Sequence, residues 1–176
     1  MVPKRLVLTC IGLFALGACS PGSADNASVM SPTYSRLLRV LYRNTVPTVQ
    51  PAALAHELEQ STGPLLLDVR TPAEYQVSHL HGARFVNYAT LANEQFTELD
   101  RQQPVVVYCS VGCRSERLGE HLHALGFIHV SNLYGGLFEW VNEGFPVYNA
   151  GGVTSNVHPY SALWSPWLKR GRKVYE

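Results

Sequence analysis

The chain has 176 residues, of which 46% are hydrophobic and 15% are charged, and its formal net charge is +1. This length is enough for one domain with a buried core plus short extensions. A net charge so close to zero gives no basis for nucleic-acid binding, so no nucleic acid is expected among the partners.

Residues 1–18 have the features of an export signal. Basic residues near the start precede an apolar run from Leu6 to Ala18, which is too short to span a bilayer as a stable anchor. The run ends in Leu16-Gly-Ala-Cys19, which resembles a bacterial lipobox. That resemblance implies cleavage before Cys19 and a lipid on its sulfur, whereas a plain secretory signal is the alternative. We therefore expect a protein of the cell envelope, anchored to a membrane through Cys19 and facing the periplasm or the exterior.

Residues 19–45 are expected to form a tether followed by a helix. Ser20 to Ser31 is rich in small and polar residues, as flexible linkers are. Thr33 to Arg43 has leucines and arginines at helical spacing. Such a helix commonly packs on its own domain, and the alternative is that it lies on anionic lipid headgroups.

Residues 46–148 alternate between short apolar runs and helical segments. We expect strands at Val46–Val49, Leu65–Val69, Ala83–Asn87 and Val105–Tyr108 and in a run ending at Leu133, with helices at residues 51–59, 72–77, 91–99 and 116–125 and after Gly136. This alternation predicts one α/β domain with a mainly parallel sheet and helices on both faces.

The stretch around Cys109 carries the strongest functional signal. The cysteine follows the run Val105–Tyr108, and Ser115 is interpreted as the N-cap of the next helix. A thiol near a helix N-terminus is favoured as thiolate; Arg114 adds a positive charge, and Gly112 allows the backbone to curl. The alternative is a buried core cysteine.

Four residues, Ser110, Val111, Gly112 and Cys113, separate Cys109 from Arg114, one fewer than in a tyrosine-phosphatase loop. This smaller loop resembles the active loop of rhodaneses, which are sulfurtransferases that hold a persulfide. Residues 65–83 and 133–147 resemble the opening and closing signatures of the same family. The resemblance implies one rhodanese module, with a three-layer α/β/α fold and about five strands in its central sheet.

The resemblance also implies a mechanism. Cys109 would take sulfur from a small anionic donor such as thiosulfate, carry it as a persulfide, and pass it to a thiol or cyanide without a cofactor. Backbone N–H groups of residues 110–114 and the side chain of Arg114 would hold the charge of the terminal sulfur. Ser110, Val111, Gly112, Cys113 and Ser115 are therefore expected to line the substrate site. Because Val111 offers no charge, thiosulfate is expected to be a poor substrate.

Asp68 and Arg70 end a predicted strand beside the expected ligand crevice. The family resemblance assigns them first to the framework, with Arg70 pairing with Glu74, and second to the lining of the substrate site.

Alternative functions depend on the two cysteines of the loop. A thiol redox sensor would use Cys109 with Cys113, although a disulfide between them would distort the loop. A phosphatase is disfavoured by the short loop, and a non-catalytic binding module by the presence of Cys109 and Arg114. The histidine pairs at 79/81 and 121/123 lack convincing ligand spacing, so no metal is predicted.

Residues 149–176 follow the predicted domain. They contain Tyr160, Trp164, Trp167 and a basic run at 169–173. We expect this segment to fold back on the domain and shape the crevice. The basic run is interpreted as a solvated end, with a membrane-surface contact as the alternative.

Overall fold

The computed structural model describes residues 30–175. The predicted signal at residues 1–18, the lipidation site Cys19 and most of the tether lie outside the described residues. Within the described range, no helix combines the length and the apolar character needed to cross a membrane.

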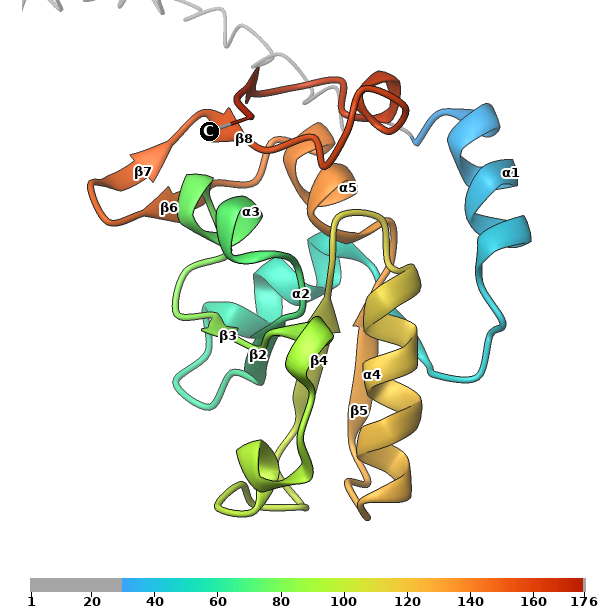
Figure 1. Cartoon of the computed structure of the whole chain (residues 1–176), viewed down its shortest axis with the longest axis vertical. Helices are drawn as coiled ribbons and strands as arrows, with labels where there is room; N and C mark the ends of the chain where they lie inside the picture. Colours follow the sequence, from blue (N-terminus) through green and yellow to red (C-terminus); the bar gives the residue numbers. More distant parts are fainter. Residues whose placement is uncertain (1–29, 176) are drawn as a thin grey trace, which may run out of the picture.

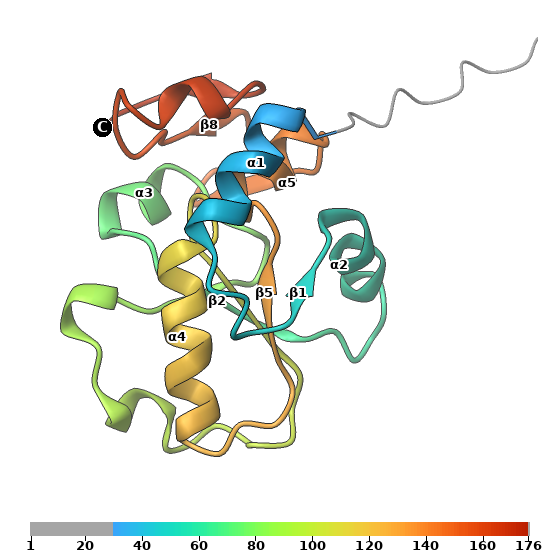
Figure 2. The same cartoon turned by 90° about the vertical axis from the view of Figure 1, so that its right-hand side faces the viewer.

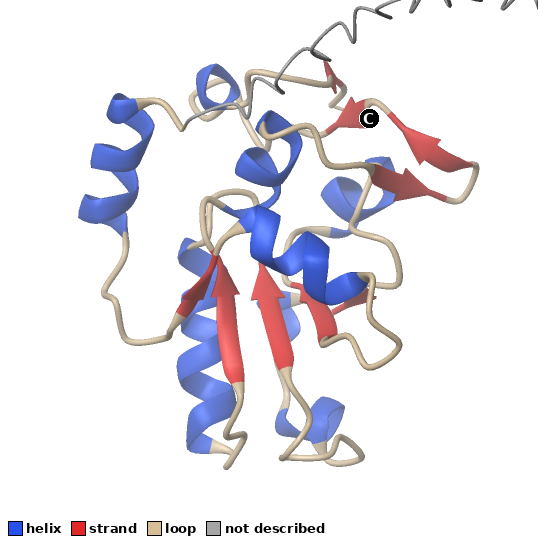
Figure 3. Cartoon of the chain, turned by 180° about the vertical axis from the view of Figure 1, so that it is seen from behind, coloured by secondary structure: helices blue, strands red, loops and turns tan. Residues whose placement is uncertain are grey.

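A five-stranded sheet forms the centre of the domain, and all of its strands are parallel (Figures 1 and 3). In sheet order the strands are β1 (Thr48–Val49), β5 (Val130–Leu133), β4 (Val105–Tyr108), β2 (Leu65–Asp68) and β3 (Arg84–Phe85). All four residues of the central strand β4 are buried, which explains its continuous apolar sequence. The predicted α/β class with a parallel sheet is confirmed.

Helices cover both faces of this sheet. Helix α4 (Cys113–Ala124) lies on one side and α2 (Pro51–Leu58) on the other (Figure 2). Alternate residues of β4 enter the two cores: Val105 and Val107 pack with α4, and Val106 packs on the side of α2 and of α5 (Gly136–Asn142). The short helix α3 (Pro72–Val77) follows β2.

The segment at residues 91–99 does not form the predicted helix. Two 3₁₀ turns occupy this region, η1 (Tyr88–Thr90) and η2 (Asn93–Phe96). The guanidinium of Arg101 donates to the carbonyls of Phe96 and Leu99 at 2.8 and 2.9 Å, so these groups are satisfied without a helix. Phe96 is nevertheless fully buried, as its place in the apolar pattern predicts.

Both ends of the described chain pack on the domain. Helix α1 (Pro32–Leu41) buries Tyr34 and Leu38 in the core that contains α5, so it packs on its own domain. The C-terminal elements are β6 (Val147–Asn149), β7 (Gly152–Thr154), β8 (Asn156–Val157), η3 (Ser165–Trp167) and β9 (Arg172–Lys173). Val157 and Leu168 are buried in the same core, and the extension therefore folds back as expected.

Candidate active site

Cys109 stands directly after β4, at the carboxyl edge of the sheet. Helix α4 begins at Cys113, with Gly112 as its N-cap, so the assignment of the N-cap to Ser115 is wrong. Gly112 has a φ of 100°, and a Cβ atom there would collide with the hydroxyl of Tyr42, so only glycine fits this tight turn. Ser115 lies inside the first helical turn, fully buried, and donates to Oδ1 of Asn132 at 2.7 Å.

The carbonyl groups of the loop all bond to donors on other elements. The four bonds are Leu137 N to Cys109 O (2.8 Å), Phe138 N to Ser110 O (3.0 Å), the Tyr42 hydroxyl to Val111 O (2.8 Å) and Asn132 Nδ2 to Gly112 O (2.9 Å). Since the carbonyls are held outward, the N–H groups of the loop curl toward the thiol. The N–H of Gly112 donates to Sγ of Cys109 at 3.1 Å.

These surroundings favour the Cys109 thiolate. Burial alone raises the pKa of Cys109. The charge of Arg114 and the hydrogen bonds from the N–H groups of Ser115 and Val111 outweigh this effect, so the pKa lies below the ordinary value. Cys113 behaves oppositely: burial, together with the negative charges of Cys109 and Glu116, raises its pKa to about 12. The loop thus contains one thiol that is favoured as thiolate and one thiol that stays protonated at neutral pH.

Arg114 is fixed by a buried carboxylate that belongs to α3. Its Nη1 and Nη2 donate to Oε2 and Oε1 of Glu74 at 3.2 and 3.1 Å, and Nη2 also donates to the hydroxyl of Ser110 at 3.0 Å. Ser110 in turn donates to Glu74. Burial raises the pKa of Glu74, but the hydrogen bonds and charge of Arg114 outweigh this effect and lower it. Glu74 thereby positions Arg114 and Ser110 together.

The predicted partner of Glu74 was Arg70, and this pairing is wrong. Arg70 instead binds Asp68, with Nε to Oδ1 at 3.0 Å and Nη2 to Oδ2 at 2.6 Å, and both side chains are fully buried. Glu74 has a recognisable signal in the sequence, since Thr71 and Glu74 form a capping box at the start of α3. That signal identifies the helix start but not the contact with Arg114, which is 40 residues away in the chain.

A cavity of about 290 Å³ opens onto Cys109. Its wall combines the loop with both terminal segments and consists of Leu41, Cys109, Ser110, Val111, Cys113, Arg114, Tyr160 and Trp164. Three of the predicted lining residues, Ser110, Val111 and Cys113, form part of this wall together with Cys109 and Arg114. Gly112 and Ser115 do not line the cavity: Gly112 contacts Sγ of Cys109 through its N–H, and Ser115 is fully buried in α4. Asp68 and Arg70 lie outside this wall, in the framework below it.

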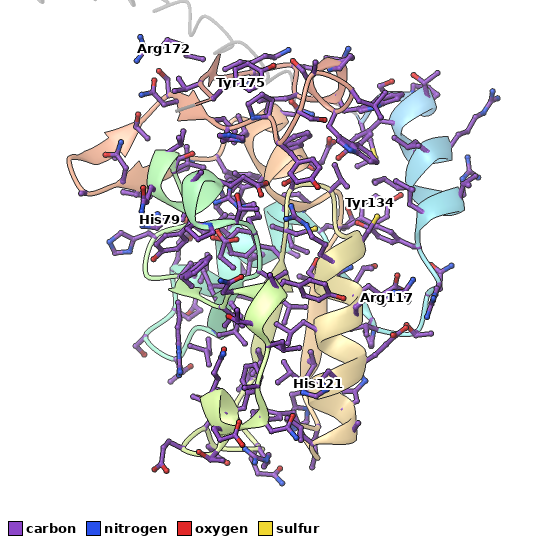
Figure 4. All side chains as sticks on the ribbon, in the orientation of Figure 1. His79, Arg117, His121, Tyr134, Arg172 and Tyr175 are labelled. Atoms are coloured by element: carbon purple, nitrogen blue, oxygen red, sulfur yellow. The ribbon has the colours of Figure 1, made fainter. Side chains whose placement is uncertain are left out.

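Tyr42 joins the loop to its surroundings. Its hydroxyl donates to Val111 and accepts from the N–H of Gly135 at 3.0 Å, and its ring meets the ring of Tyr134 edge to face. Tyr134 lies beside the loop, whereas Arg117 extends from α4 toward the segment before β1 (Figure 4). Within residues 30–175, no three His, Cys, Asp or Glu side chains gather as a metal site would require.

Comparison with known proteins agrees with this geometry. The family model described as "Rhodanese-like domain" matches residues 51–143. A sulfurtransferase of Allochromatium vinosum is 30% identical over 58% of this chain and 94% of its own length. A thiosulfate sulfurtransferase of Coxiella burnetii is 34% identical over 49% and 79%, respectively. The solution structure of a rhodanese-like domain from Anabaena has a TM-score of 0.54 and 28% identity, covering 58% of this chain and 79% of that one.

Removing the charge of Arg114 should make Cys109 less reactive. In a Cys113→Ser background, Arg114→Ala is expected to raise the pKa of Cys109 and to slow its alkylation by iodoacetamide at pH 7 by about tenfold, because the main charge that stabilises the thiolate is lost. The pKa and the rate are both obtained by measuring the alkylation rate as a function of pH. Arg117→Ala, on the same helix but paired with Glu120, is the control and should leave the profile unchanged.

Glu74 should contribute to stability in a pH-dependent way. Glu74→Gln leaves Arg114 without its counter-charge and is expected to lower the free energy of unfolding at pH 7 by about 3 kcal/mol. Because the native pKa of Glu74 is lowered, its contribution is complete above the ordinary value of 4.5 and disappears as the pH falls through the native pKa. Urea unfolding at decreasing pH should therefore show a flatter acid limb in the variant. Glu98→Gln, at an exposed position, serves as control, and equal acid limbs for wild type and Glu74→Gln would contradict the assignment.

Proposed function

The chain belongs to the family of rhodanese-like domains, whose relatives above are sulfurtransferases, and from this premise we propose that Cys109 carries sulfur as a persulfide. The observation that carries the proposal is the loop around Cys109, in which the carbonyls of residues 109–112 bond outward and the thiol has a lowered pKa. This arrangement supports a nucleophile that accepts and passes on one sulfane sulfur atom, with the negative charge resting on the terminal sulfur in between.

Transfer proceeds in two substitutions at sulfur. The Cys109 thiolate attacks the outer sulfur of a donor such as thiosulfate, a new S–S bond forms, and sulfite leaves with the electron pair of the bond that breaks. The terminal sulfur of the persulfide then carries the negative charge, which the loop N–H groups and Arg114 stabilise. An acceptor thiolate or cyanide attacks that sulfur and releases Cys109 as thiolate, so the enzyme undergoes no net oxidation.

The two thiols of the loop favour sulfur transfer over thiol–disulfide exchange. Exchange needs a second thiolate to resolve the first bond, and the pKa of about 12 keeps Cys113 protonated at neutral pH. Sulfur transfer needs only Cys109. Cys113 then serves as a wall residue of the cavity.

Loading with sulfur is the direct test. The purified domain, incubated with thiosulfate, is expected to gain the mass of one sulfur atom, and a reductant should remove it. Cys109→Ser should gain none and should lose sulfur transfer to cyanide by at least about a thousandfold, because no other group of the loop is a comparable nucleophile. Cys113→Ser is the matched control and should still load. Intact-protein mass spectrometry decides the matter, and a loss of two hydrogens in place of a sulfur gain would support a Cys109–Cys113 disulfide.

We further propose that the mature protein is anchored to the cell envelope through a lipid on Cys19, on the strength of the sequence Leu16-Gly-Ala-Cys19. Cells grown with a radiolabelled fatty acid are expected to label the wild-type chain and not Cys19→Ser. The variant should also leave the membrane fraction, since it lacks the lipid that is proposed to anchor the wild-type chain. Label retained on Cys19→Ser would refute lipidation at this residue.

A further inference from the structure

We propose that the loop at residues 158–171 makes the Cys109 cavity selective for organic sulfane-sulfur compounds with an apolar body, through Tyr160 and Trp164. This inference rests on the proposed sulfur transfer and names the class of sulfur compound that the same site takes. The loop lies outside residues 51–143, which match the family model.

The two ends of this loop are paired with each other, and its second half is bonded to the rest of the domain. Strands β8 and β9 pair on either side of it, and the N–H of Val174 donates to the carbonyl of Val157 at 3.0 Å. In its second half, the side chain of Asn142 donates to Trp167 O and accepts from the N–H of Lys169, at 3.0 and 2.7 Å. The ring of Trp167 stacks on Tyr34 of α1, with centroids 5.4 Å apart. The loop is therefore a preformed wall and not a loose end (Figure 1, red).

Tyr160 is held in an uncommon conformation where it meets the active site. Its φ is 64°, which residues with side chains seldom adopt, and the N–H of Ser161 closes a tight turn on Pro159 O at 2.7 Å. The N–H of Tyr160 donates to Nδ1 of His158 at 3.0 Å. This backbone directs the Tyr160 ring over Arg114, with the guanidinium carbon 4.8 Å from the ring centroid. Backbone strain that places a side chain on a catalytic group is a mark of function.

The charge in the cavity is already compensated. Among the described residues of its wall, Arg114 is the only ionised group besides the Cys109 thiolate. The buried carboxylate of Glu74 compensates the charge of Arg114, and the ring of Tyr160 covers one face of the guanidinium. A dianion such as thiosulfate therefore finds no free positive charge on entering beside a thiolate. The other walls, Leu41, Val111 and Trp164, are apolar and favour a body that loses its hydration.

The volume of the cavity points to the same class. At about 290 Å³ it lies just below the smallest pockets that hold drug-sized ligands, about 300 Å³, and so suits a small organic molecule. A tetrahedral inorganic anion would leave much of the space between Trp164 and Leu41 unfilled. A donor R–SO₂–S⁻ with an apolar R group would fill it: the Cys109 thiolate takes the outer sulfur, and R–SO₂⁻ leaves with the electron pair of the broken S–S bond.

Two thiosulfonates that differ only in their apolar body provide the test. Benzenethiosulfonate and methanethiosulfonate carry the same transferable sulfur, and the rate at which each loads Cys109 is measured by quenched-flow mass spectrometry, with thiosulfate alongside. The wild type is expected to favour the phenyl donor, and Trp164→Ala should reduce the phenyl-to-methyl rate ratio by about tenfold. Tyr160→Ala should lower the same ratio and raise the relative rate of thiosulfate, because Arg114 is uncovered. Leu163→Ala is the control, since Leu163 belongs to the same loop but is 78% exposed.

The outcomes separate the two levels of the proposal. If no donor loads Cys109, the proposed sulfur transfer fails and the selectivity falls with it. If all donors load Cys109 but the wild type shows no phenyl preference, or Trp164→Ala keeps the wild-type ratio, the transfer stands and the selectivity is overturned. Should the loop variants not fold, the wild type alone decides: benzenesulfinate, the leaving group, must inhibit loading by thiosulfate at least about tenfold more strongly than methanesulfinate.

Discussion

The site depends on one constraint: the backbone after β4 must turn all its carbonyls away from a sulfur atom that becomes negatively charged. Each carbonyl then needs a donor elsewhere, and the donors come from distant parts of the chain, namely α5, β5 and Tyr42. Gly136 allows α5 to come this close, because a Cβ there would collide with the carbonyl of Cys109. The fold thus supplies, from outside the loop, the hydrogen-bond donors that the loop carbonyls need.

Charge balance around the loop follows from the same need. Arg114 must stabilise a thiolate, yet an isolated guanidinium would be costly at a position where most of its side chain is buried. Glu74 removes this cost by accepting two hydrogen bonds from it, and the pKa of Arg114 stays raised despite burial because Cys109 and Glu74 both favour its charge. The second buried pair, Asp68 with Arg70, also bonds to the carbonyl of Ser78 and so connects the end of β2 to the end of α3.

Local sequence patterns predicted the fold, whereas contacts between distant segments could not be predicted from such patterns. The apolar run before Cys109 and the helical pattern after it predicted the place of Cys109 between β4 and α4, because strand and helix periodicities are local properties. Ser115 was misassigned as an N-cap because serine has that preference, whereas the close approach of Tyr42 selects Gly112 for the turn. Glu74 could be placed at a helix start, but its pairing with Arg114 depends on how α3 packs against the loop.

The cavity at Cys109 is formed partly by residues within the family match and partly by residues outside it. Cys109, the loop amides, Arg114 and Glu74 all lie in residues 51–143, which match the family model. Leu41 on α1, with Tyr160 and Trp164 in the C-terminal loop, lies beyond that range and forms the outer wall of the cavity. Trp167 and Tyr34 stack on each other, so the two terminal segments form one continuous cover. A compound that reaches Cys109 through this cavity contacts these side chains, so the preference for one sulfur compound over another that we propose resides outside the part of the chain that matches the family model.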